Sequence, residues 1–120
     1  MMVLDSSAIL AFLKGEDGGD GVAPHLENGV VSAANWSEVA QKVIAHGGDW
    51  ASARAVLVSF GLSIEPTTDA DAERAASLWE RGSGLSLGDR LCLALAERLA
   101  TEVITADRAW GESDRIIQLR

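Results

Sequence analysis

Two aspartates directly follow short apolar segments, a position from which carboxylates can act together on a ligand. Asp5 comes after Met2–Leu4, and Asp107 comes after Val103–Ala106. If both segments are parallel strands, their carboxyl ends lie at one edge of the sheet, where open α/β sheets bind ligands. The two carboxylates converge there if the strands are neighbours. Helix capping is the alternative for each, because aspartate is favoured at a helix N-cap.

Asp89 is a third candidate because of the helix that it begins. With about 100° per residue, Asp89 falls on the same side of that helix as Leu93 and Ala96. The polar residues Arg90 and Glu97 mark a different, solvent-facing side. A carboxylate on the buried side needs a cation, a metal or several donors, since an isolated buried charge is costly. Capping of the first helical turn is again the alternative.

The pattern around Glu38 favours exposure instead. The apolar stripe of its helix, which includes Val39 and Val43, points away from Glu38. Lys42 follows four residues later, the spacing of a modest surface ion pair. Periodicity alone therefore predicts a solvated Glu38, unless a second element covers that face.

Short apolar segments alternate with amphipathic helices along the chain. We expect strands at 2–4, 30–32, 62–66, 103–105 and 116–117, and helices at 6–14, 35–46, 49–60, 68–82 and 90–100, with a glycine-rich acidic loop at 15–21. This alternation predicts an α/β fold with a parallel sheet. The length of 120 residues corresponds to one domain spanning residues 1–120.

Composition narrows the class of protein. Ten basic and eighteen acidic residues give a net charge of −8, which repels polyanions and argues against a binder that covers phosphates with lysines. An enzyme that meets phosphates through divalent metals stays possible, because bound cations invert the local charge. The single cysteine rules out a disulfide framework. The short apolar runs and the early Asp5 predict a cytoplasmic protein without a membrane span.

Three familiar motifs fail in this sequence. Gly84–Gly88 matches G-x-S-x-G, but it follows a predicted helix and no histidine comes after Ser86. The glycines between 15 and 21 lack the Gly-Lys-Ser/Thr of a phosphate-binding loop. A phosphoacceptor receiver domain needs a late lysine, and the last lysine here is Lys42.

Four acidic segments, taken in order, resemble the PIN-domain family, and most closely its VapC ribonuclease toxins from toxin–antitoxin pairs. These segments are Met2–Ala8, Ser37–Val39, Leu85–Arg90 and Ile104–Trp110. The resemblance implies a three-layer α/β/α sandwich around a central parallel sheet, with an acidic pocket that binds Mg²⁺ or Mn²⁺.

The resemblance also implies roles for individual residues. It implies catalytic acids at Asp5, Glu38, Asp89 and Asp107, of which Asp5, Asp89 and Asp107 are the expected metal ligands. Supporting hydroxyl groups are expected from Ser6 and Thr105, and Arg90 and Arg108 are candidate contacts to RNA phosphates. Including Glu38 on this basis overrides the prediction from periodicity.

The implied chemistry agrees with the residue types. Carboxylates that share a pocket raise one another's pKa unless a cation lies between them, and hard oxygen ligands favour Mg²⁺ or Mn²⁺. The predicted function is a metal-dependent endoribonuclease with an RNA substrate, a cognate antitoxin and a homodimeric state. The apolar stretch Ala55–Phe60 is a candidate contact surface, with core packing as the favoured interpretation. The competing hypothesis is a non-catalytic α/β interaction module whose aspartates only cap helices.

Overall fold

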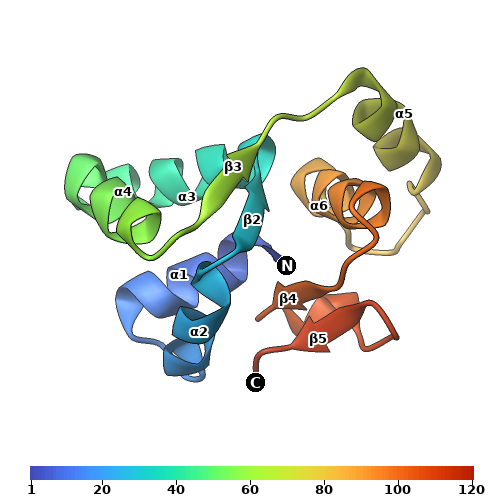
Figure 1. The fold of residues 1–120 in the computed structure, drawn as a ribbon. Helices are drawn as coiled ribbons and strands as arrows, with labels where there is room; N and C mark the ends of the chain where they lie inside the picture. The colour runs from blue at the N-terminus through green and yellow to red at the C-terminus, as the bar shows by residue number, and fades with distance from the viewer.

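A five-stranded parallel sheet organises the computed structural model, which describes residues 1–120 (Figure 1). The strands, in chain order, are β1 Met2–Leu4, β2 Gly29–Ser32, β3 Ser63–Glu65, β4 Val103–Thr105 and β5 Ile116–Gln118. Their spatial order is β3-β2-β1-β4-β5, and every pair is parallel. The chain therefore builds outward from β1 through β2 to β3, then returns to place β4 on the other side of β1. The direction of winding reverses between β1 and β4.

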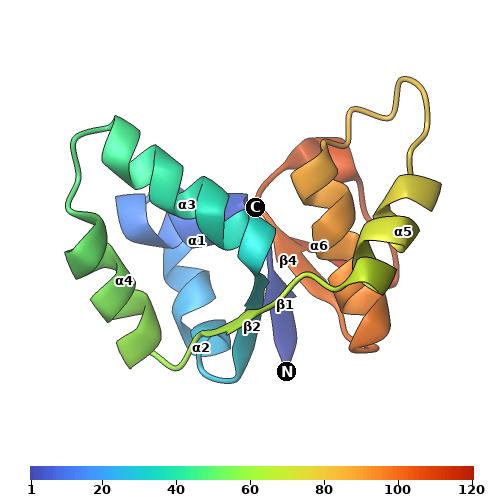
Figure 2. The ribbon, with the colours of Figure 1, turned by 90° about the horizontal axis from the view of Figure 1, so that it is seen from above.

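Helices cover both faces of this sheet. They are α1 Ser6–Lys14, α2 Ala23–Leu26, α3 Ala33–Ala45, α4 Trp50–Ser59, α5 Asp69–Ser77 and α6 Leu87–Arg98, with short 3₁₀ turns η1 Gly19–Val22 and η2 Arg108–Trp110. Figure 2 shows α1 to α4 on one side of the strands and α5 and α6 on the other. The predicted three-layer α/β/α architecture is confirmed. None of the helices combines the length and apolar character needed to cross a bilayer.

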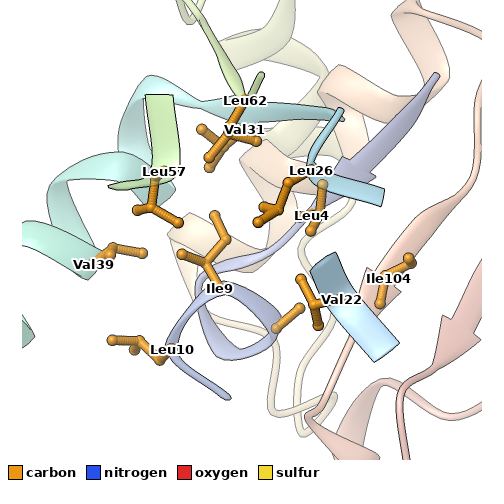
Figure 3. Close-up of a cluster of buried hydrophobic side chains, with 11 residues drawn as sticks. Leu4, Ile9, Leu10, Val22, Leu26, Val31, Val39, Leu57, Leu62 and Ile104 are labelled. Carbon is orange, nitrogen blue, oxygen red and sulfur yellow. The ribbon is translucent and has the colours of Figure 1, made fainter. Parts of the chain in front are cut away.

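The three central strands, β1, β2 and β4, form because their residues are apolar on both faces. Alternate positions point to opposite sides of a strand, and here each side has its own buried cluster. Val3, Val30 and Val103 pack against α6, in a cluster with Cys92 and Leu95. Leu4, Val31 and Ile104 pack against α1 to α4, in the cluster that Figure 3 shows. The sequences of these strands are continuous apolar runs, as is typical of parallel strands that are buried on both faces.

Two helix boundaries differ from the sequence expectation by three residues or more, and the short helix α2 is not predicted from the sequence. The helix predicted to continue to residue 82 ends at Ser77, whose hydroxyl donates to the carbonyl of Arg74 at 2.7 Å. The amide of Trp79 then donates to the carbonyl of Ala76, three residues back, at 3.1 Å, so the α-helical hydrogen-bond pattern stops there. The helix expected from Arg90 begins three residues earlier, because Ser86 and Asp89 form a capping box. Asp89 is thus the third residue of α6.

The interpretation of Ala55–Phe60 as core is wrong for most of that stretch. Leu57 is wholly buried, whereas Val56, Val58 and Phe60 are 41–45% exposed. The reason is that α4 is an outer helix whose single buried side chain is Leu57. The docking of α4 therefore depends on Leu57, together with the half-buried Trp50 at its start, whose ring packs edge-on against Trp36.

This packing predicts that substitutions at two neighbouring positions lower the free energy of unfolding by very different amounts. Leu57→Ala should lower the free energy of unfolding by about 2–5 kcal/mol, because it removes buried surface and leaves a cavity. Val58→Ala, at a side chain that is 42% exposed, should cost less than about 1 kcal/mol. Urea denaturation of both variants measures the difference. Equal losses would show that α4 does not dock through Leu57.

Candidate active site

The direction in which the chain winds reverses between β1 and β4, and this places two of the predicted acids at the same edge of the sheet. Asp5 follows β1, and its amide donates to the carbonyl of Ile104 in β4 at 3.1 Å. Asp107 stands two residues beyond the end of β4. Because the two strands are hydrogen-bonded neighbours, their carboxyl ends open into the same region. In open α/β sheets, this crevice at the winding reversal is where ligands bind.

Asp5 is buried and is held by neutral donors only. Its side chain is the N-cap of α1 and accepts from the amide of Ala8 at 2.9 Å. The Ser7 hydroxyl lies 2.7 and 2.9 Å from the two carboxylate oxygens, and the Thr105 hydroxyl donates to one of them. The residue is 3% exposed and takes part in no ion pair. The capping role is real, but it leaves a buried carboxylate without a cation.

Burial raises the pKa of Asp5 to about 6. The hydrogen bonds from Thr105, Ala8 and Ser7 lower this pKa in part, and the negative charge of Asp89 raises it further. The pKa of the Cys92 thiol, which lies beneath the site, is also raised well above its usual value. Burial is the main cause, and the charges of Asp5, Asp89 and Glu38 add to it. The charges of Asp5, Asp89 and Glu38 therefore all reach the Cys92 thiol, and the charge of Asp89 also reaches Asp5.

Asp89 caps α6 and still has an unused oxygen. One oxygen accepts from the amide of Ser86 at 2.9 Å, while the Ser86 hydroxyl accepts from the amide of Asp89 at 3.2 Å. No hydrogen bond ends on the other oxygen. Asp71 occupies the same capping position in α5, but Arg98 pairs with its carboxylate at 2.9 Å. Asp89 has no such cation, so the two capping aspartates differ in charge balance.

The expectation of a solvated Glu38 is wrong. Glu38 is half-buried, because the N-terminus of α6 covers the face of α3 that periodicity assigns to solvent. Its carboxylate accepts from the Asn35 amide at 2.6 Å, and no ion pair with Lys42 forms. A side-chain carbon at Gly88 would stand 2.8 Å from a Glu38 oxygen. Glu38 therefore lies against the residue that precedes Asp89.

Thr105 connects Asp5 with Asp107. It is wholly buried, donates to Asp5 and accepts from the amide of Asp107 at 3.0 Å. Asp107 itself is exposed and caps η2 by accepting from Ala109 at 2.9 Å. The fourth acid thus stands at the solvent end of a hydrogen-bonded chain that begins at Asp5.

The hydroxyl beside Asp5 belongs to Ser7, not to Ser6. Besides contacting Asp5, the Ser7 hydroxyl accepts from the amide of Ala106 at 2.9 Å, which joins α1 to the end of β4. Side chains in a helix lean toward its N-terminus, so the second helical residue can reach back to the N-cap. That geometry is a signal in the sequence that favours Ser7 over Ser6.

The two predicted RNA-contacting arginines occupy different surroundings. Arg90 is half-buried and donates to the carbonyl of Ala75 at 2.8 Å, so it braces α5 against α6. Arg108 is exposed beside Asp107 and forms no ion pair. The arginine available to a ligand in this structure is Arg108.

The chemistry of the acidic side chains fits a divalent cation. None of the four acids has a basic partner, Asp5 is buried, and Asp89 has an unused oxygen. Carboxylate oxygens are the ligands that Mg²⁺ and Mn²⁺ prefer. As placed, however, no three acidic, histidine or cysteine side chains converge closely enough to hold a metal ion. A pocket of about 380 Å³ lies elsewhere, between α1, α3 and α4, and includes none of the four acids.

Comparison with known proteins defines the class. Residues 2–115 match the PIN domain family, and the chain belongs to that family. No curated protein sequence matches it. Among solved structures, it resembles a toxin–antitoxin complex from Klebsiella pneumoniae with a TM-score of 0.82 and 19% identity, covering 100% of this chain and 98% of the other.

Two further solved structures share the fold. One is a VapC toxin of Mycobacterium tuberculosis described as cleaving the sarcin-ricin loop (TM-score 0.74, 18% identity, 95% of this chain and 98% of the other). The second is DNA-bound VapBC from Salmonella typhimurium (TM-score 0.69, 16% identity, 99% and 98%). At these identities, the likeness establishes the fold.

The raised pKa of Asp5 predicts a specific dependence of stability on pH. Between the usual value of 3.8 and about 6, the folded chain keeps a proton on Asp5 that the unfolded chain has released. In metal-free protein, the contribution of Asp5 to the free energy of unfolding should therefore fall by about 3 kcal/mol as pH rises through this range. Asp5→Asn should lack that fall.

Urea denaturation of both proteins in EDTA, at intervals from about pH 4 to about pH 7, measures this contribution as their difference. Parallel pH profiles would contradict the assigned burial of an ionisable Asp5.

Proposed function

We propose that this chain is a metal-dependent endoribonuclease that hydrolyses RNA phosphodiester bonds and acts as a VapC-type toxin. The observation that carries this proposal is a group of acids without basic partners at the winding reversal of the sheet. Asp5 is buried there, the charge of Asp89 reaches it, and Glu38 lies against the start of α6. PIN-domain membership supports a nuclease, and nucleases of this family typically depend on divalent metals.

The surroundings of each residue indicate the role that it would have in the reaction. Asp5, Asp89 and Asp107 would hold Mg²⁺ or Mn²⁺, which polarises a phosphoryl oxygen and activates water when bound. Ser7 and Thr105 fix the orientation of the Asp5 carboxylate, and the capping box fixes that of Asp89. Glu38 would add negative charge at the edge of the site, which strengthens binding of the cation, and can accept a proton there. Arg108 can contact a phosphate of the RNA backbone.

The acidic charge of the chain sets how RNA would be held. With a net charge of −8 and Arg90 occupied by Ala75, the free protein offers few cations to a polyanion. Productive binding therefore requires the metal, which supplies local positive charge. Location in the cytoplasm, together with the RNA substrate, is part of the proposal.

Protein partners belong to the proposal as well. Solved structures that share this fold include toxin–antitoxin complexes. On this chain, the side chains of Val56 on α4 and of Phe60 just after it are exposed and lie four residues apart, so they share one side of the helix and form an apolar surface that another protein can cover. We propose that the chain forms a homodimer and is held inactive by a cognate antitoxin.

Asp89→Asn should abolish RNA cleavage while keeping the fold. The asparagine oxygen can still accept from Ser86, whereas the charge that attracts a cation is lost. We expect cleavage with Mn²⁺ or Mg²⁺ to fall by at least about 100-fold, and to disappear in EDTA. Gel assays on several RNAs, including structured transfer RNA, measure the rate.

Asp69→Asn is the matched control, since it removes an equal charge from an exposed site at the start of α5. It should cleave like the wild type. Cleavage that persists in EDTA or in folded Asp89→Asn would contradict the proposal. If neither wild type nor variant binds Mn²⁺ in calorimetry, the non-catalytic interaction module becomes the better account.

The homodimer predicts a simple mass measurement. Light scattering of the isolated chain should give twice the chain mass of 12.6 kDa. Phe60→Lys should shift the protein toward the monomer, because it places a charge on the exposed apolar surface. A wild-type mass of one chain at all concentrations would contradict the dimer and leave the nuclease proposal intact.

A further inference from the structure

Asn35 is a wholly buried polar residue at the junction of α3 and α6. Its side-chain amide nitrogen donates to the Glu38 carboxylate at 2.6 Å and to the backbone carbonyl of Gly88 at 3.2 Å. One side chain thus connects Glu38 on α3 with the residue immediately before Asp89 on α6.

The other half of this amide has no partner. The side-chain oxygen of Asn35 is buried and accepts no hydrogen bond. Turning the amide around would place that oxygen against two acceptors, the Glu38 carboxylate and the Gly88 carbonyl, so the orientation is fixed. A buried acceptor without a donor lowers stability. A leucine of similar size would avoid this cost but would also remove the two hydrogen bonds, so the contribution of the amide lies in its contacts with Glu38 and Gly88.

The direction of the Asn35 side chain along α3 indicates what the amide does. Asn35 is the third residue of α3, and its backbone amide donates to the N-cap residue Ser32. In α5 and α6, the third residues are Asp71 and Asp89, whose side chains reach back to the N-cap amide. The Asn35 side chain instead points forward to Glu38.

Glu38 needs such a contact to keep its place. A glutamate side chain is long and rotates freely, and Glu38 has no ion pair to hold it. Gly88 leaves the space that its carboxylate fills, since a side-chain carbon there would stand 2.8 to 3.0 Å from all three carboxylate atoms. The Asn35 amide fixes the carboxylate in that space.

We propose that Asn35 is a positioning residue, which holds the Glu38 carboxylate over Gly88 so that it faces the acidic site beside Asp89. This inference rests on the proposed nuclease function, because it assigns Glu38 a role toward the cation and RNA. If Asn35 only connects α3 to α6 through Gly88, the effect of removing its amide on Mn²⁺ affinity is the same whether residue 38 is Glu or Gln.

A double-mutant cycle separates these two roles. Mn²⁺ affinity is measured by electron paramagnetic resonance, without RNA, for wild type, Asn35→Leu, Glu38→Gln and the double variant. We expect Asn35→Leu to weaken binding about tenfold, and to change it less than about twofold when Glu38 is already Gln. Cleavage rates at saturating Mn²⁺ should show the same non-additivity.

Thermal unfolding accompanies each measurement. Because Asn35→Leu removes two hydrogen bonds together with the unpartnered oxygen, each variant must be shown to be folded at the assay temperature, and Asn35→Ala provides a second variant if leucine does not fit. Gln41→Ala, which removes an exposed amide from the same helix, should match the wild type throughout.

Three results would overturn the inference. Folded Asn35 variants with wild-type Mn²⁺ affinity and cleavage rate would exclude a positioning role. Effects that multiply in the double variant would show that Asn35 acts independently of Glu38. A wild-type chain that neither binds Mn²⁺ nor cleaves RNA would remove the proposed function, and the inference with it.

Discussion

Burial of the Asp5 carboxylate between the ends of β1 and β4 is the constraint on which the rest of the site depends. An ionised carboxylate in an apolar setting requires donors, and this chain supplies the amide of Ala8 and the hydroxyls of Ser7 and Thr105. All are neutral, so the site retains its negative charge. The same hydroxyls bind the backbone at Ala106 and Asp107, and thereby connect the start of α1 to the end of β4.

The positive charges that form ion pairs are placed elsewhere. Arg74 pairs with Glu97, and Arg98 pairs with Asp71 and Glu65, all in the region of α5, α6 and β3. Asp71 and Asp89 show the effect of this distribution most directly. They occupy the same capping position in two helices, yet only Asp71 meets an arginine. The capping box therefore sets the position of Asp89, and the absence of a cation leaves its charge available.

Local patterns in the sequence predict the sheet and most helices well. Apolar residues on both strand faces identify β1, β2 and β4, and the spacing from Asp5 to Lys14 identifies α1 with its N-cap. The reversal of winding direction that brings Asp5 and Asp107 to the same edge of the sheet cannot be deduced from this alternation alone, because it also depends on the strand order.

Glu38 and Ser7 could not be placed by the same patterns. The surroundings of Glu38 depend on α6, which is about fifty residues away in the chain and covers a face of α3 that periodicity within α3 assigns to solvent. No local pattern singles out Asn35, because one of its two partners, the Gly88 carbonyl, comes close only when α3 and α6 pack together. Ser7 required helix direction as well as residue type. The end of α5 involves a change to three-residue backbone hydrogen bonds at Trp79, for which the sequence carries no strong stop signal before Gly82.

The central claim is that these acids bind a divalent cation together. A crystal structure of the chain grown with Mn²⁺ tests it most directly, because anomalous scattering locates the ion without reference to any activity. We predict an anomalous peak at the carboxyl ends of β1 and β4, with carboxylate oxygens of Asp5 and Asp89 as ligands. Well-diffracting crystals at saturating Mn²⁺ with no ion at this edge of the sheet, or with an ion only at other surface acids, would contradict the account.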